Sequence, residues 1–145
     1  MKRHLKLAAI VALSFAATHA MARNSVDSYS VSTALESAEG KVDADIGLYF
    51  AGQKHPAVLK TLGEAATNKK TNAVGRSDEA ACDHVFLSAV IALQKRAREM
   101  GGNAVVNIKS NYKDQLTESP TQFVCGAGAV IAGVALKGDI VTLKK

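Results

Sequence analysis

Residues 123–136 read FVCGAGAVIAGVAL, a stretch of fourteen residues that carries no charge and is rich in glycine. A membrane-spanning helix needs about 20 apolar residues and glycine is a poor helix former, so this stretch does not read as a membrane anchor. A phosphate-binding loop needs a lysine after its last glycine, whereas Val134 follows Gly133. The stretch therefore predicts buried strand, with small side chains that let a helix pack closely.

The segments around this stretch predict further strands. The whole C-terminal region, residues 122–143, is long enough for two strands or for one bent strand. Apolar and small residues alternate over 45–52, and residues 103–112 alternate with one polar face. Residues 57–71 alternate more weakly around Gly63, and we interpret them as a strand followed by a polar loop at 68–77.

The clearest element is a helix predicted over residues 78–100. Ser77 suits the N-cap, acidic residues follow it in the first turn, and Gly101 suits the C-terminal end. Apolar residues recur on one face at steps of three and four: Cys82, Val85, Phe86, Ala89, Leu93, Ala97 and Met100. The predicted fold is therefore α+β, with a small, mostly antiparallel sheet packed on one long amphipathic helix.

The N-terminal residues 1–22 have the pattern of a secretory signal. A basic start precedes an apolar run at 7–17, and Ala20-Met21-Ala22 gives the small residues that a signal peptidase requires. We expect an exported, periplasmic chain that begins near Arg23. We further expect a flexible lead-in over 23–44 that contains an edge strand, and a single domain over 45–145.

Charge and aromatic content argue against a nucleic-acid binder. Of the 18 Lys and Arg residues, three lie in the predicted signal, which leaves 15 against 13 Asp and Glu, a net charge of +2. The whole chain has three Tyr, four Phe and no Trp to stack on bases.

Two cysteines, Cys82 and Cys125, fall in the predicted mature chain. In an oxidising compartment an even pair most simply predicts one disulfide, and the alternative is two buried free thiols. A metal site built from Cys82, Asp83 and His84 is geometrically poor, since residues one and two apart on a helix point to different sides. We therefore predict no metal and no cofactor.

Nucleophilic catalysis also lacks a recognisable set of residues. Ser77, Ser88 and Ser110 have no elbow motif around them, and His55 next to Pro56 suits a turn better than a general base. The sequence predicts no catalytic residue.

Several of these segments together resemble the YbjQ-like superfamily, which also contains the outer-membrane stress sensor RcsF. The resemblance covers about residues 57–143 and is carried by VLKTLGEA, RAREMGGNAVVNIKSNY and QFVCGAGAVIAGVALKGD. LYFAGQKHPAV, KTNAVGRSDEAAC and GVALKGD are similar to a subgroup of small exported proteobacterial proteins often labelled as excinuclease ATPase subunits. This chain lacks the phosphate-binding lysine motif of such an ATPase.

The resemblance implies a compact sheet on one long helix, with disulfides between them. Cys82 matches the start of the family helix and Cys125 matches the last strand region. RcsF has four such cysteines and a lipid-modified cysteine, whereas this chain has two and lacks the lipid site. We expect a non-enzymatic domain that acts through protein contacts in envelope homeostasis or stress sensing. The alternative is a small-ligand or metal-binding oligomer whose pocket the Gly/Ala-rich strand lines.

Overall fold

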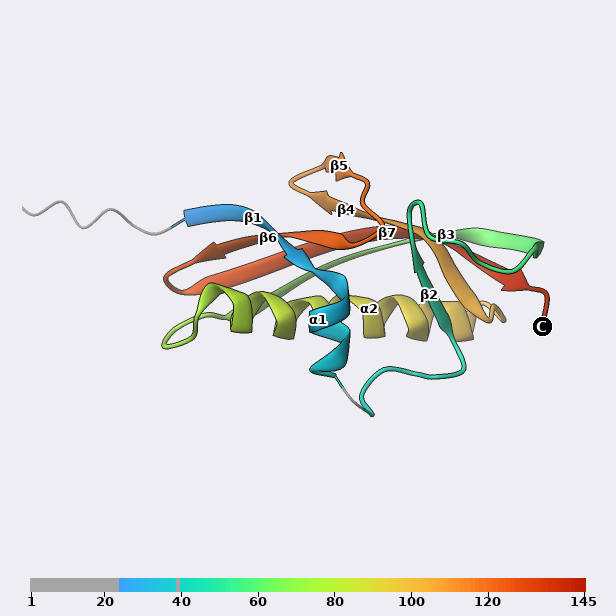
Figure 1. Cartoon of the computed structure of the whole chain (residues 1–145), viewed down its shortest axis with the longest axis horizontal. Helices are drawn as coiled ribbons and strands as arrows, with labels where there is room; N and C mark the ends of the chain where they lie inside the picture. The colour runs from blue at the N-terminus through green and yellow to red at the C-terminus, as the bar shows by residue number, and fades with distance from the viewer. Residues whose placement is uncertain (1–23, 39) are drawn as a thin grey trace, which may run out of the picture.

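The computed structural model describes residues 24–38 and 40–145 as a curved sheet with one long helix on one face (Figure 1). The predicted signal at 1–22 lies outside the described residues. The helices are α1 (Val31–Glu36) and α2 (Asp78–Glu99), and the seven strands are β1 (Asn24–Ser30), β2 (Gly47–Phe50), β3 (Val58–Asn72), β4 (Ala104–Tyr112), β5 (Gln115–Thr117), β6 (Gln122–Gly128) and β7 (Ile131–Leu143). All strand pairs are antiparallel except β2–β4, so the predicted α+β class with a mostly antiparallel sheet is confirmed. No helix in the described ranges is long and apolar enough to cross a membrane.

The uncharged stretch at residues 123–136 forms the centre of this sheet. It is two strands, β6 and β7, joined by a short turn, rather than one bent strand. β7 pairs with β3 along one side, and on its other side with β6 near its start and with β4 near its end. The apolar composition follows from this position, because a strand that has neighbours on both sides and a helix on one face is largely buried.

Helix α2 confirms the predicted helix almost residue for residue. The Ser77 hydroxyl accepts a hydrogen bond from the Ala80 N–H at 3.1 Å, Met100 is the C-cap, and Gly101 follows with φ at +80°. The predicted apolar face is buried, with Met100 partly buried at its end. Phe86 stacks on Phe123 of β6 with ring centroids 4.1 Å apart, which fixes the helix over the sheet centre.

A disulfide joins the first turns of α2 to the central strand β6. The Cα atoms of Cys82 and Cys125 lie 5.9 Å apart and both side chains are fully buried. The bridge spans a sequence separation of 43 residues and ties the helix to the sheet beside the Phe86–Phe123 stack.

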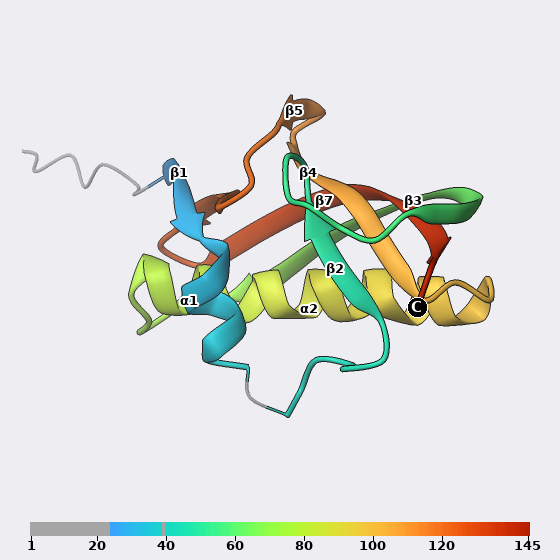
Figure 2. The same ribbon diagram turned by 45° about the vertical axis from the view of Figure 1, so that its right-hand side comes forward.

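Residues 24–36 differ from the expected flexible lead-in, since they form β1 and α1. All seven residues of β1 pair with β6, and Val31 and Ala34 of α1 are buried. Helix α1 follows β1 directly and lies against α2 (Figure 2). The expected edge strand is present as β1, which among the described residues begins at Asn24. β1 is held by backbone hydrogen bonds to β6 and not by burial of apolar side chains. Its sequence therefore shows no clear alternation of apolar and polar residues.

Three local expectations also need correction. β3 continues to Asn72, so the predicted loop at 68–77 is shorter by five residues. In β4, Asn107 adopts φ of +53° and the pairing with β7 shifts there, which places both Val105 and Ile108 in the core instead of on opposite faces. Gly126 makes room for Tyr112, not for the helix, because a Cβ at this position would lie 1.9 Å from the Tyr112 hydroxyl.

Candidate interaction surface

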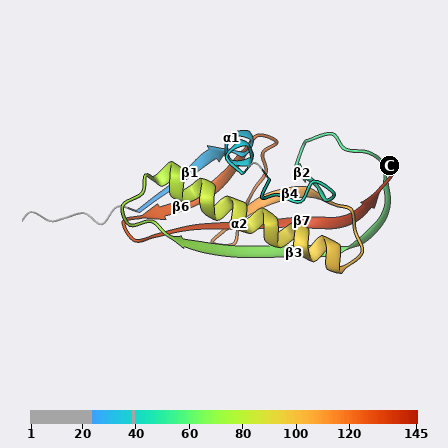
Figure 3. The same ribbon diagram turned by 90° about the horizontal axis from the view of Figure 1, so that it is seen from below.

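The longest exposed feature of the sheet is the outer edge of β3. Within the described part of the chain, this strand of fifteen residues pairs only with β7 (Figure 3). The pairing is irregular between Val58 and Gly63 and then runs without interruption from Gly63 opposite Ile140 to Asn72 opposite Ile131. A regular strand with one unpaired edge presents a row of backbone N–H and C=O groups to any extended chain that reaches it.

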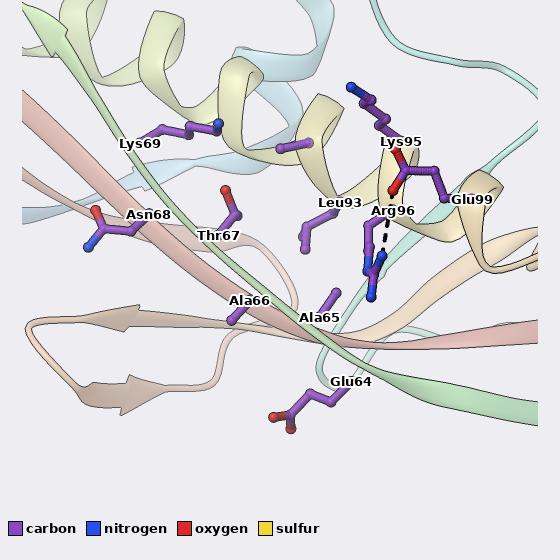
Figure 4. Close-up of a pocket in the computed structure, with 11 residues that line it drawn as sticks. Glu64, Ala65, Ala66, Thr67, Asn68, Lys69, Leu93, Lys95, Arg96 and Glu99 are labelled. Carbon is purple, nitrogen blue, oxygen red and sulfur yellow. Dashed lines mark ion pairs between the residues drawn. The ribbon is translucent and has the colours of Figure 1, made fainter.

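A groove of about 510 Å³ lies between β3 and α2 (Figure 4). Thr67 and Lys69 point from β3 towards the helix, whereas Glu64 points away from it. The groove is lined by Glu64, Ala65, Ala66, Thr67, Asn68 and Lys69 of the strand and by Ala92, Leu93, Lys95, Arg96 and Glu99 of the helix. Its lining includes the small side chains of Ala65, Ala66 and Ala92.

The charged groups of the groove are unequally paired. Arg96 forms an ion pair with Glu99 at 3.6 Å, and Glu64 forms one with Lys137 at 3.1 Å on the outer face of the sheet. Lys69 and Lys95 have no ion pair with any described residue and are exposed. The groove therefore offers two uncommitted ammonium groups to an acidic side chain or to another anion.

The surface extends to a small apolar tip beyond the end of β3. Val74, Val130 and Ile131 are each more than half exposed, and a shallow depression joins them to Lys70, Thr71 and Asn72. Edge, groove and tip together form one continuous surface along β3, which we call the β3 surface.

The residues weighed for metal binding do not come together. The sulfur of Cys82 is in the disulfide, and no group of three or more His, Cys, Asp or Glu side chains in the described ranges is arranged to hold a metal. Partial burial raises the pKa of the Asp83 carboxyl, and the negative charge of the nearby Glu79 raises it further. His84 is exposed on α2.

The residues weighed for catalysis make structural hydrogen bonds. Ser77 caps α2, the Ser88 hydroxyl donates to the His84 carbonyl at 3.3 Å, and the Ser110 hydroxyl accepts from the Val124 N–H at 2.9 Å. His55 contacts the Pro56 carbonyl through Nδ1 at 2.8 Å and lies edge-on to Tyr49. None of these contacts joins a nucleophile to the side chain of a base.

Sequence reasoning missed one buried polar contact that shapes the side of the molecule away from β3. Gln94 on α2 is 3% exposed; its side-chain oxygen accepts from the Asp43 N–H, and its amide donates to the carbonyls of Asp43 and Ile46. Arg98, one turn further, hydrogen-bonds the Asp43 carboxylate and thereby lowers its pKa, with the Asp45 N–H as the next cause. A polar residue next to the apolar face of the predicted helix is the signal that could have pointed to Gln94.

Comparisons with known proteins add little to this description. No family model and no curated protein matches the chain. A crystal structure of a protein of unknown function from Pediococcus pentosaceus, described as belonging to the DUF74 family, is similar with a TM-score of 0.46 and 13% identity, over 68% of this chain and 98% of that chain. A likeness of this strength supports neither a family assignment nor a function.

Proposed function

We propose that the protein is an exported, non-enzymatic periplasmic domain that works through protein contacts in the cell envelope, in homeostasis or stress sensing. The observation that carries this proposal is the open edge of β3, fifteen residues long and flanked by the groove. An extended segment of a partner can add to such an edge as a further strand, with main-chain hydrogen bonds for affinity and side-chain contacts for selectivity.

The charges of the β3 surface indicate what kind of segment fits. Lys69 and Lys95 line the groove without ion pairs among the described residues, and Lys70 lines the separate depression at the apolar tip. A segment with acidic side chains on its helix-facing side and an aliphatic residue near the tip would complement this surface.

Two further features support export. Residues 1–22 have the charge and apolar pattern of a secretory signal. The buried Cys82–Cys125 bridge is of the kind that persists in oxidising compartments. The resemblance to YbjQ-like and RcsF-like proteins adds the envelope as the place of action.

A second candidate function, binding of a small anionic ligand, is favoured by the size of the groove. Its volume of about 510 Å³ falls within the range of ligand sites. The expected ligand-binding oligomer has a pocket lined by the Gly/Ala-rich strand, whereas Gly126 and Gly133 are buried at the centre of the sheet in this single chain. The groove beside β3 offers such a ligand the ammonium groups of Lys69 and Lys95, which have no ion pair with a described residue.

Site-specific photo-crosslinking in the periplasm tests the main proposal. A benzoylphenylalanine at Asn68, exposed on β3, should give an adduct with a different envelope protein, and the same probe at exposed Lys41, next to α1, should not. The identified partner should then bind the purified protein, and Lys69→Glu should weaken that binding. Equal adducts at both positions, or no adduct together with turnover of a metabolite, would contradict the proposal. The mass of the purified protein reports at the same time whether the chain begins near Arg23.

A further inference from the structure

We infer that the open edge of β3 also pairs with the same edge of a second copy, antiparallel and in one register, with the two-fold axis at Thr67. The inference rests on the proposed function, since it names one occupant of the same edge. The observations behind it are the regularity of the strand from Gly63 to Asn72 and the positions of its three charges, Glu64, Lys69 and Lys70.

Symmetry restricts how two copies of one strand can pair. Two antiparallel neighbours in one sheet are related by an axis perpendicular to that sheet, so side chains that face the helix in one copy face the helix side in the other. Residues that lie opposite each other must therefore point to the same face. Glu64 and Lys69 point to opposite faces of β3, as Figure 4 shows, so they cannot form a cross-strand pair. The axis must pass through a residue rather than between two residues.

Charge then selects among the remaining registers. With the axis at Thr67, Glu64 of each copy lies opposite Lys70 of the other, which gives two opposite-charge pairs on one face. An axis at Glu64, Lys69 or Lys70 puts a charge opposite itself. An axis at Ala65 leaves Glu64 opposite Ala66 and brings the irregular part of β3, before Gly63, opposite Lys69 and Lys70. An axis at Ala66 or Asn68 leaves Glu64 opposite an asparagine. Lysines on an edge usually oppose edge-to-edge pairing. Within the regular segment from Gly63 to Asn72, only the axis at Thr67 sets Glu64 opposite a lysine.

The groove is compatible with the same register. Lys69 of the second copy lies opposite Ala65, on the face where Glu99 lines the groove, and the residues nearest the axis, Ala66, Thr67 and Asn68, are small. The ion pair between Glu64 and Lys137 keeps the Glu64 carboxylate on the outer face, where Lys70 of the second copy would approach it. Pairing would cover the edge that the proposed partner needs, so a second copy and the partner would compete for β3.

A charge swap tests the register. Sedimentation equilibrium on the exported protein should show a dimer, and Glu64→Lys or Lys70→Glu alone should raise its dissociation constant about tenfold through the two symmetry-related pairs. The double variant Glu64→Lys/Lys70→Glu should restore dimerisation. The matched control Glu64→Lys/Lys69→Glu has the same net charge but should stay weak, because Lys69 does not face Glu64. Urea unfolding of each variant checks that it remains folded.

Cysteine scanning gives a second readout of the axis. Thr67→Cys should form a covalent dimer on oxidation, whereas Thr71→Cys, four residues away on the same face of β3, should not. A wild-type protein that stays monomeric at millimolar concentration, or a control double variant that dimerises as well as the swap, overturns the inference. A monomer that still gives the Asn68 adduct with another protein overturns the inference alone. A dimer whose charge-reversed, monomeric variant Glu64→Lys also gives no such adduct contradicts the proposed function alone.

Discussion

Reduction of the Cys82–Cys125 bridge is expected to lower the free energy of unfolding by about 4 kcal/mol. The bridge closes a loop with a sequence separation of 43 residues, which contains most of α2 and all of β4 and β5. Opening it lets the unfolded chain recover the entropy of that loop, which for about 43 residues corresponds to roughly 4 kcal/mol at 25 °C. A small domain has a total stability of about 5–15 kcal/mol, so this is a large fraction of it.

Urea unfolding with and without a thiol reductant measures this effect. With a slope of about 1.5 kcal/mol per molar urea, the midpoint should fall by about 2–3 M on reduction. The double variant Cys82→Ala/Cys125→Ala separates the cross-link from packing, since it also loses the contacts of two buried sulfurs. Its midpoint should lie at or below that of the reduced wild type and should not respond to the reductant. Equal midpoints for oxidised and reduced wild type would refute the reasoning.

Gly126→Ala should destabilise the fold by about 2 kcal/mol, because its Cβ would lie 1.9 Å from the Tyr112 hydroxyl. In a double-mutant cycle measured by thermal unfolding, the stability lost in Gly126→Ala plus that lost in Tyr112→Ala should exceed the stability lost in the double variant. Gln94→Leu should cost about 3 kcal/mol in urea unfolding, since it leaves one backbone N–H and two carbonyls without their partner. Gln94→Glu should cost at least as much at neutral pH, because its buried carboxylate keeps the acceptor but faces the two carbonyls to which the amide donates. The lowered pKa of Asp43 stabilises the folded state above the ordinary aspartate pKa of about 4, and this contribution is lost as the pH falls through the lower folded-state value. The stabilities of wild type and Asp43→Asn, compared over an acid titration in urea, should therefore differ at neutral pH and converge in acid, and a constant difference would contradict this.

The parts of the fold that follow from one-dimensional patterns could be predicted. α2 combines a cap, an apolar stripe and a glycine end, and these signals agree from Ser77 to Gly101. The run from Phe123 to Leu136, in β6 and the first half of β7, carries no charge because it lies at the sheet centre. The pairing of Cys82 with Cys125 follows from cysteine number and predicted compartment, and the two sulfurs lie together in the structure.

The parts that depend on backbone pairing between distant segments could not be predicted in the same way. β1 is held by its ladder to β6, one hundred residues away in sequence, and its exposed polar side chains carry no signal of that partner. The bulge at Asn107 reverses the side-chain alternation within β4, so the period-two pattern assigned its second half to the wrong face. Lys113 and Asp114, both with positive φ, form the turn into β5 without the glycine that usually indicates such a turn.

The β3 surface could be predicted only in part: the sequence indicated the strand but not its open edge. Its sequence alternates only weakly because α2 covers just part of one face, so most of its side chains are exposed and need not be apolar. β3 has fifteen residues but contributes few buried side chains, so it is held mainly by its backbone pairing. β7 occupies only one of its two edges. The charges at Glu64, Lys69 and Lys70 then have little to do with the core. They decide which chain can occupy the other edge, and whether that chain is a second copy or a different protein is what the charge swap and the crosslinking at Asn68 separate.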